Sequence, residues 1–492
     1  MSNEYRRTHP YTIFMNLKIS VILLLLPVLR QLIHSPQNIF EIIRTLSLNT
    51  IYAIGVLSYA VYSYRRYMYR LLPYGIEVKS GLFIQKFFTL PYNKIQTVNI
   101  YKSALSSLLG AAKISIDSPG GTSRRYDISA FFSHHYTEIL TELLNSGKKK
   151  KAVYRSDNSS ILLMCAFWSN PTTGLLLAAP FISRLGTAAG NEIRHILYHS
   201  MDIFWEKLAV QISPVTASVA NMLIIGWVIA VVIEFLRYGR FSTARIGKYI
   251  VVSRGIFNRN ITYTRADRIA AVTVNQSLLM RILGLYSAGI FTIGAGKLKG
   301  DKSLIIAAEK KKELHRHLKQ MVRISPDEKK IVRPAGSALF SYVMLPFLIT
   351  LLIMSILVTV DYFSVIDEIF KVIMLFTLIP LVWWIMFRIY AHRHSHLALN
   401  SRQLIVSSYR KLTVQKYIIP FEQLQYISII QNPMQRLAHT CTVKVYLYYE
   451  KRAFHTIKNL PLSETTDLLN NAQRYSVKRT ISASALIKQP ND

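Results

Sequence analysis

Three histidines at alternate positions are the first residues in the sequence that could bind a metal. In a strand, His392, His394 and His396 would share one face, and imidazole is a good ligand for several transition metals. No carboxylate or thiol lies nearby in the sequence to complete a site. We therefore interpret the segment as a basic strand at a membrane edge, and we expect no metal and no cofactor.

Other candidate chemistry is weaker. The pairs His134–His135 and His315–His317 do not have the i, i+4 spacing that places two imidazoles on one helical face. The segment 293–296 contains two glycines but lacks the G-K-[ST] ending of a phosphate-binding loop. We find no paired-carboxylate or nucleophile motif, and acidic residues are scarce, with 26 Asp and Glu against 60 Lys and Arg. We therefore expect that the protein is not an enzyme.

The composition combines apolar and basic residues. The 492 residues are 51% hydrophobic and only 17% charged, whereas soluble proteins average about 25% charged residues. The formal net charge is nevertheless +34. This combination predicts a membrane protein with strongly basic parts. Cys165 and Cys441 form no C-x-x-C motif, so we expect two buried thiols in a reducing compartment.

Six apolar windows have about the 20 residues that a membrane-spanning helix needs. They pair into three hairpins, and we interpret the first as a retained anchor because no small-residue cleavage site follows it. Between the third and fourth windows, residues 184–214 have apolar residues at helical spacing and could form either an interfacial helix or a small helix packed on the spans. The windows are approximately 13–33, 46–64, 161–183, 215–235, 338–360 and 369–389.

Charge predicts the orientation of these spans. The three long segments that follow the hairpins carry the basic excess, whereas the link 361–368 holds three acidic residues and no Lys or Arg. The positive-inside rule then places both termini and all three segments in the cytoplasm of a multi-pass cell-membrane protein.

Two groups of basic residues are candidate membrane contacts. The first group lies beside tyrosines at the predicted membrane edges, where Arg and Tyr are common anchors. The second group forms lysine runs that could face anionic lipid or a partner; nucleic acid is the less favoured ligand for them. The first group is Arg65, Arg66, Arg237, Arg240, Arg388 and Arg393, and the second is Lys148, Lys149, Lys150, Lys151, Lys310, Lys311 and Lys312.

An internal repeat dominates the organisation of the chain. Residues 81–116, 255–290 and 410–445 align without a gap. Each copy alternates apolar and polar residues as half-buried strands do, contains a helical turn near 103–109 or its equivalent, and leads to a predicted helix at about 133–146, 308–322 or 462–475.

The pattern predicts an α+β membrane protein with six transmembrane helices in three hairpins, each followed by a small cytoplasmic β-barrel or sandwich with a C-terminal helix. The predicted boundaries are residues 1–64, 151–236 and 326–388 for the hairpins, and residues 65–150, 237–325 and 389–480 for the β-rich domains.

The repeated motifs resemble those of the bacterial pleckstrin-homology (PH) type 2 membrane-protein family. They are a G-[ILV]-F strand start at Gly81 and Gly255, a turn at Pro91–Ile95 and Arg265–Ile269, and a [QK]-S-x-L segment ending at Gly110 and Gly284. The third copy departs at Arg410 and His439. The resemblance implies a PH-like fold, a smaller one-domain partner of the same family, and a role in tolerance of membrane-active antimicrobial peptides.

Two functions remain open from the sequence. The favoured one is a non-enzymatic membrane scaffold or sensor that contacts membrane lipids through its basic domains. The alternative is a transport or lipid-handling protein, although none of the apolar windows has the central charged residue that ion pathways usually need. We expect no nucleic-acid partner.

Overall fold

The computed structural model describes residues 4–17, 39–81, 84–118, 126–145, 150–169, 214–292, 303–324, 326–363, 367–400, 402–410, 413–447, 455–477 and 487–488. The chain divides into two compact units. The N-terminal unit comprises residues 1–155, 231–268 and 294–300, and the C-terminal unit comprises residues 156–230, 269–293 and 301–492.

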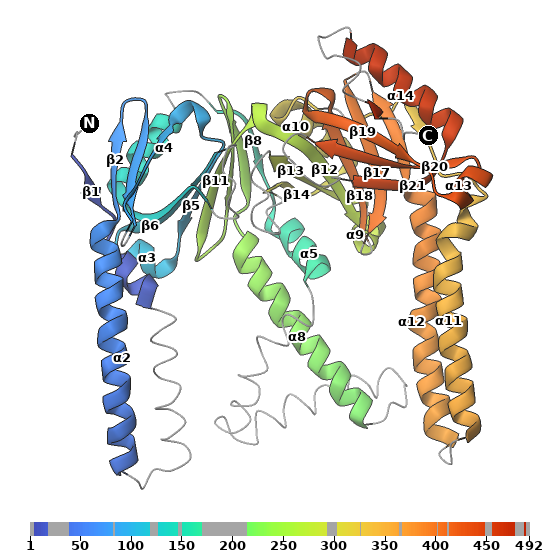
Figure 1. Cartoon of the computed structure of the whole chain (residues 1–492), viewed down its shortest axis with the longest axis horizontal. Coiled ribbons are helices and arrows are strands. Elements are labelled where there is room, and N and C mark those ends of the chain that lie inside the picture. The colour runs from blue at the N-terminus through green and yellow to red at the C-terminus, as the bar shows by residue number, and fades with distance from the viewer. Residues whose placement is uncertain are drawn as a thin grey trace. The chain divides into compact units, whose positions relative to one another are not determined.

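The N-terminal unit is built on two antiparallel sheets. One has the order β1-β2-β3-β4, and the other has seven strands in the order β7-β6-β5-β11-β10-β9-β8 (Figure 1). Alternation of apolar and polar side chains produces these strands, as in β5, where Val98 and Ile100 are fully buried. The strands are β1 (Arg6–Arg7), β2 (Met68–Leu72), β3 (Gly75–Ser80), β4 (Lys86–Pro91), β5 (Thr97–Lys102), β6 (Ala111–Asp117), β7 (Ile128–Ser133), β8 (Lys150–Arg155), β9 (Ser242–Ile246), β10 (Tyr249–Arg254) and β11 (Arg259–Arg265).

The C-terminal unit also has one seven-stranded and one four-stranded sheet. Their orders are β14-β13-β12-β18-β17-β16-β15 and β21-β20-β19-β22. All pairings are antiparallel except that of β19 with β22. The strands are β12 (Ile269–Ser277), β13 (Leu285–Thr292), β14 (Ser303–Lys310), β15 (Lys330–Val332), β16 (His396–Asn400), β17 (Gln403–Arg410), β18 (Thr413–Pro420), β19 (Leu424–Ile430), β20 (Thr440–Leu447), β21 (His455–Pro461) and β22 (Ile487–Lys488).

The helices are of three kinds. Long helices are α2 (Ile39–Arg66), α8 (Pro214–Tyr238), α11 (Ala338–Phe363) and α12 (Asp367–His394), with the shorter α5 (Asn158–Trp168). Closing helices are α4 (His134–Asn145), α10 (Lys311–Met321) and α14 (Leu462–Val477), as the sequence predicted. Five-residue helices are α3 (Ala104–Leu108), α9 (Leu278–Ile282) and α13 (Pro433–Leu437).

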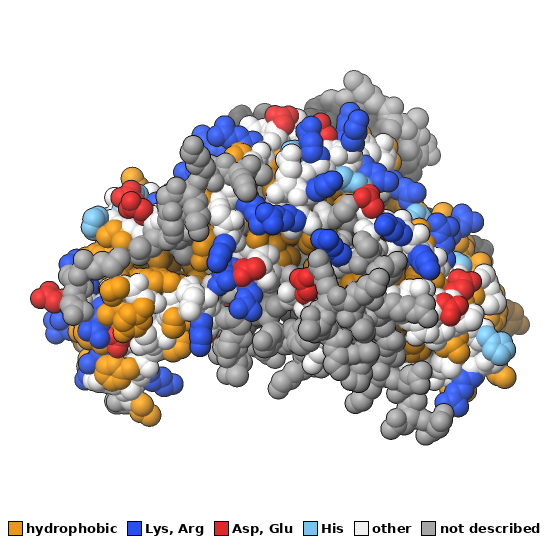
Figure 2. All heavy atoms as spheres, turned by 90° about the horizontal axis from the view of Figure 1, so that it is seen from above, with side chains coloured by type: hydrophobic (Ala, Val, Ile, Leu, Met, Phe, Trp, Pro, Cys, Tyr) orange, Lys and Arg blue, Asp and Glu red, His pale blue; other side chains and the backbone are white. Residues whose placement is uncertain are grey.

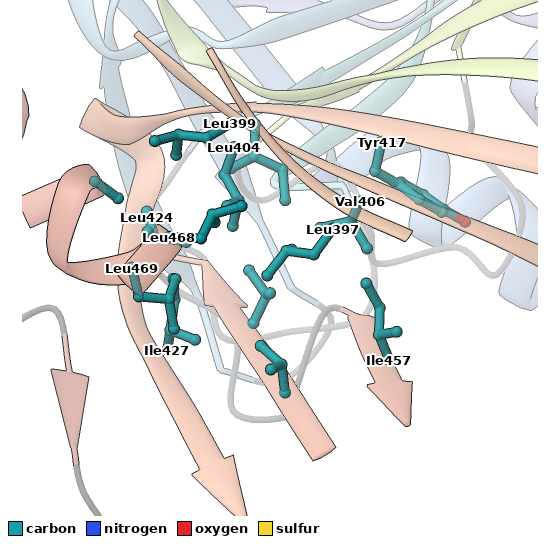
Figure 3. Close-up of a cluster of buried hydrophobic side chains, with 14 of the residues drawn as sticks. Leu397, Leu399, Leu404, Val406, Tyr417, Leu424, Ile427, Ile457, Leu468 and Leu469 are labelled. Carbon is teal, nitrogen blue, oxygen red and sulfur yellow. The ribbon is translucent and has the colours of Figure 1, made fainter. Parts of the chain in front are cut away.

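A closing helix packs on its sheet through one apolar stripe. In α10, Leu314, Leu318 and Met321 are fully buried at i, i+4 and i+7, and the remaining faces are charged. In α14, Leu468 and Leu469 enter a core with residues from the strands of both C-terminal sheets, including Leu404 of β17 (Figure 3). This burial explains why the helical period is visible in the sequence.

A short strand precedes the first apolar window of each predicted hairpin, which the sequence analysis missed. β1 pairs with β2, β8 with β9, and β15 with β16, so the segment that enters a hairpin is hydrogen-bonded to the segment that leaves it. Tyr69, Thr243 and Ala398 occupy the same repeat position and pair with Arg6, Tyr154 and Ile331.

The sheets do not follow the repeat boundaries. β5 of the first repeat pairs with β11 of the second, and β12 of the second repeat pairs with β18 of the third. We call these two pairings the repeat joints. The prediction of a separate barrel for each repeat is therefore wrong, because neighbouring repeats complete each other's sheets.

The prediction of six transmembrane helices is also wrong for this structure. Among the described residues, one helix is long and apolar enough to cross a membrane, at Ala338–Thr359 in α11, with a mean hydropathy of 2.4. The window 13–33 and the segment 184–214 lie mostly outside the described residues, and α5 contributes an apolar stretch of only Asn158–Phe167. The described parts of α2, α8 and α12 contain no apolar stretch of sufficient length.

Candidate membrane interface

The five-residue helices α3, α9 and α13 occupy the same position in the three repeats. They directly follow the equivalent strands β5, β12 and β19. A polar side chain caps each one. The Ser106 backbone N–H donates to Ser103 Oγ at 3.1 Å, and the Gln435 N–H donates to Asn432 Oδ1 at 2.7 Å. In α9, the Met280 N–H donates to Ser277 Oγ at 3.2 Å. These caps satisfy backbone donors that a short helix leaves open, so each turn is held rigidly.

Left-handed residues follow these helices. Gly110 has φ +68° and Gly284 has φ +63°, conformations that glycine adopts without strain. His439 has φ +49° at the equivalent position of the third repeat. The departure of the third copy from the sequence motif therefore leaves the backbone geometry intact but places a side chain where one is unfavourable.

Each short helix buries one side chain and exposes large apolar ones. Ser106, Met280 and Gln435 are almost fully buried and hold the helices to their sheets. The residue at the last helical position is by contrast highly exposed, at 83% for Leu108, 80% for Ile282 and 86% for Leu437. One turn earlier, the side chains of Leu105, Leu279 and Met434 are also exposed. We call these six residues the apolar tips.

In the C-terminal unit, α9 lies against the end of α12. Arg281 donates hydrogen bonds to the Tyr390 hydroxyl and to His394 Nε2, the latter at 2.7 Å. His394 Nδ1 donates to the Tyr390 carbonyl at 2.9 Å, which leaves Nε2 as the acceptor. Burial lowers the pKa of His394, and the Arg281 charge lowers it further, which favours the neutral ring.

The third short helix lies beside the start of α11. Gln435 Nε2 donates to Asn459 Oδ1 at 2.6 Å, and Asn459 Nδ2 donates to Ser341 Oγ of α11 at 3.2 Å. Arg388 of α12 donates to the Tyr342 carbonyl at 3.0 Å, which ties α12 to α11 at the same level. The tip of α13 is thus fixed next to α11, which contains the candidate membrane-spanning stretch Ala338–Thr359.

In each unit, Figure 1 shows the short helices at the end of the sheets from which long helices extend. In the N-terminal unit α3 lies at the end of the sheets where α2 ends, and α4 lies at the other end. In the C-terminal unit α10 and α14 lie opposite to α11 and α12. The apolar tips and the long helices therefore point to the same side within a unit.

Five of the six predicted interface arginines lie at or just beyond helix ends, and Arg388 lies six residues before the end of α12. Arg66 donates to the Tyr62 hydroxyl at 2.9 Å, and Arg237 pairs with Glu234 at 2.9 Å. Arg65 shares the last turn of α2 with Arg66, Arg240 follows α8 with φ +54°, and Arg388 and Arg393 belong to the last turns of α12.

The predicted lysine sites are not brought together with the tips. Lys150 and Lys151 are strand residues of β8, whereas Lys148 and Lys149 lie outside the described residues. Lys310 ends β14, and the exposed Lys311 and Lys312 begin α10, at the end of the sheet away from α11 and α12. Figure 2, which views that opposite side, shows more Lys and Arg than Asp and Glu among the described residues. Basic charge is therefore present on both sides of the sheets.

The histidine triplet does not share a strand. His392 and His394 lie in α12, and His396 begins β16. His396 Nε2 instead donates to Glu328 at 3.0 Å, and Lys416 Nζ pairs with the same carboxylate at 2.7 Å. In the described part of the chain, no group of three His, Cys, Asp or Glu side chains could hold a metal ion.

One hollow of about 310 Å³ lies between β2 and α4 in the N-terminal unit, lined by residues that include Arg6, Arg70 and His135. Arg70 in this hollow pairs with Glu77 at 2.6 Å, and the Arg6 guanidinium lies over the Tyr136 ring.

The strands, closing helices and repeated short helices define a chain of bacterial PH domains. The family model described as "Bacterial PH domain" matches residues 19–145, 205–322 and 343–476, and the chain belongs to this family. Among curated proteins it is similar to the UPF0699 transmembrane protein YdbT of Bacillus subtilis (strain 168), with 20% identity over 347 residues. The match covers 64% of this chain and 68% of the relative.

The apolar tips could have been found from the sequence. The first Leu of the S-x-L-x-x-x-L-G motif is a tip position, Leu105 or Leu279, and a second apolar residue, Leu108 or Ile282, follows it three residues later, on the same side of a helical turn. We interpreted that segment as a structural turn and a family marker, and did not expect the apolar positions to lie at the surface.

Proposed function

We propose that the protein is a non-enzymatic membrane scaffold whose three repeats rest on the bilayer surface through their apolar tips. The observation that carries the proposal is the exposure of Leu108, Ile282 and Leu437, at 80% or more in all three repeats. Single exposed apolar residues are common, but the same exposed position in three diverged copies beside the ends of long helices is not expected by chance.

The energetics favour shallow insertion. Full burial of a leucine side chain contributes about 1.5–3 kcal/mol, so six partly inserted tip residues together provide several kcal/mol. A nearby basic residue adds about 1 kcal/mol at an anionic surface. Arg281 and Arg436 lie in α9 and α13 themselves, directly before Ile282 and Leu437. Tips and charge thus act on the same surface.

The proposal includes an orientation and a biological role. The domains lie on the cytoplasmic side of the cell membrane, since the basic excess lies in them. The chain acts with a smaller one-domain protein of the same family and contributes to tolerance of membrane-active antimicrobial peptides. Support comes from membership of the bacterial PH family and from likeness to a protein named as transmembrane. Loss of the gene should raise sensitivity to such peptides, and unchanged sensitivity across a panel would contradict this role.

Depth-dependent quenching tests the membrane contact. We would place an environment-sensitive fluorophore on Leu108→Cys, Ile282→Cys or Leu437→Cys in the full chain reconstituted into liposomes, and quench it with lipids spin-labelled at different acyl depths. We expect quenching by shallow labels at all three positions. Lys312→Cys in α10 is the matched exposed control, and we expect no quenching there. Equal quenching at Lys312 and at the tips would reject the proposed interface.

A further inference from the structure

The two repeat joints are the same joint formed twice. In the first, Val98 of β5 pairs with Tyr263 of β11. In the second, Val272 of β12 pairs with Ile418 of β18. Val98 and Val272 are equivalent positions of the repeat, as are Tyr263 and Ile418. Each joint is antiparallel over six residue pairs and has an identical register.

Each joint covers apolar side chains of the incoming strand. Tyr263 is 6% exposed and belongs to the core that contains Val98, and Ile261 of the same strand packs against that core. In the second joint Ile418 and its partner Val272 are both fully buried. The strand that adds to the sheet therefore inserts alternate side chains into the core of the neighbouring repeat.

The first repeat has the same strand with an open edge. β4 is equivalent to β11 and β18, and it ends its sheet, with β3 on one side and no strand of the described residues on the other. Its side chains are accordingly exposed, with Phe87 at 60% and Phe88 at 41%. Phe87 is equivalent to Ile261, which the first joint covers. An open edge with exposed aromatic residues is a template for pairing with another strand.

The third repeat has the complementary strand. β19 is equivalent to β5 and β12, and its Ile427 and Ile429 are buried in the C-terminal core, as Val98 and Ile100 are in theirs. The edge that forms the joint in β5 and β12 is met in β19 only by β22, a parallel strand of two residues that pairs with Ile427 and Ser428. Among the described residues, β22 covers a fraction of the six-residue length used in the joints.

We propose that β4 of one copy pairs with β19 of a second copy of this chain, in the register of the repeat joints, and displaces β22. This register sets Phe88 opposite Ser428 and Lys86 opposite Ile430. It also sets Phe87 opposite Ile429, over the core of the third repeat. The occupant is a second copy because the chain itself carries both halves of a joint that it already forms twice.

The contact joins different surfaces of the two copies, so it is heterologous. Heterologous contacts close into rings or continue as open assemblies. The C-terminal segment, through β22, then acts as a competitor for the edge of β19 and limits the length of the assembly. Removal of residues 487–492 therefore strengthens the contact.

Register-specific disulfides test the proposal. Opposed residues of an antiparallel pair have Cα atoms about 4.5–5.5 Å apart, within the range that a disulfide bridges, whereas a shift by two residues places them at about 7–8 Å. A copy with Phe88→Cys and one tag would be co-expressed with a full-length copy carrying Ser428→Cys and another tag, and oxidised in the membrane. Phe88→Cys with Ile430→Cys is the mismatched control, and Lys86→Cys with Ile430→Cys is a second matched pair. Each single variant controls for the native thiols, both of which are buried.

We expect both matched pairs to form a two-tag dimer at a yield about tenfold above the mismatched pair, and the yield to rise when residues 487–492 are removed. Equal yields from matched and mismatched pairs, or no dimer even after that removal, would overturn the proposal. A photo-reactive phenylalanine analogue at position 88 identifies the occupant in cells. Adducts containing the tagged second copy support the proposal, and adducts confined to a different, smaller protein refute it.

Discussion

The ion cluster of Glu328, His396 and Lys416 provides a test of the C-terminal unit with a defined pH dependence. Glu328 lies between α10 and β15, and its side chain is 18% exposed. Burial alone would raise the pKa of this carboxyl, but the hydrogen bonds from His396 and Lys416 reverse the effect and lower the pKa from 4.5 to about 2. At 1.36 kcal/mol per pKa unit, the cluster stabilises the ionised folded state by roughly 3 kcal/mol.

The substitution Glu328→Gln removes the charge and keeps the size of the side chain. Because the folded pKa lies below the unfolded value, the stabilisation is complete above about pH 4.5 and is lost as the pH falls towards 2. We expect the variant to be less stable by up to about 3 kcal/mol at pH 7, and the difference to fall to about half or less at pH 3. Thermal unfolding of the detergent-solubilised full chain at pH 7, 5, 4 and 3 measures the difference.

Glu309 offers the matched control. It also bonds a histidine, His317 at 2.9 Å, but burial dominates and the pKa of Glu309 is raised. A raised carboxyl pKa gives the opposite sign, since protonation then favours the folded state. The difference in stability between wild type and Glu309→Gln should therefore not shrink as the pH falls, whereas the difference for Glu328→Gln should. A gap for Glu328→Gln that stays constant from pH 7 to 3 would refute the electrostatic reasoning.

Three further predictions concern the backbone and a buried thiol. His439→Gly should raise the unfolding free energy by about 1 kcal/mol, because it relieves left-handed backbone strain. Gly284→Ala should lower the unfolding free energy by a similar amount through the same strain alone, because a Cβ at this position meets only open space. Melting temperatures that do not move in opposite directions would contradict this. Gly255→Ala should prevent normal folding, because its Cβ would lie 2.0 Å from the Asn258 carbonyl oxygen at φ +103°, while Gly336→Ala, with nothing within 4 Å, should express normally; comparable yields of folded protein would refute it. Cys441 is fully buried, and burial raises the pKa of its thiol, so maleimide should label it only on unfolding; rapid labelling of the native protein would show that the core opens.

Local signals made part of this structure predictable. The closing helices follow from apolar residues at helical spacing, such as Leu314 and Leu318, and the short helix after Ser103 follows from its cap and from the break in strand alternation. Both depend on residues within a few positions of one another. The internal repeat then extended each assignment to all three copies and indicated the family.

Non-local pairing and the membrane spans were not predictable in the same way. β1 consists of two arginines whose strand conformation exists only because β2 lies beside them, and β11 has no sequence signal that assigns its partner to the preceding repeat. Window hydropathy counted every apolar stretch as a span, whereas a single helix in the described residues meets the length and apolarity required. The alternation of basic residues at His392 and His394 predicts a strand. In the structure both residues instead continue a helix that starts far upstream, at Asp367.

The repeat joints also set an order for folding during synthesis. β5 leaves the ribosome long before its partner β11, and β12 long before β18, so each joint strand has an unpaired edge until the following hairpin and the first strands beyond it have been made. At about 5–20 residues per second, the roughly 150 residues between partner strands take on the order of ten seconds or more to appear. During that interval the nascent chain presents the edges most prone to incorrect pairing. Translation pauses or chaperone contacts would therefore affect the yield of folded protein most when they act between Lys102 and Arg259. Those that act between two neighbouring strands of one repeat would affect it less.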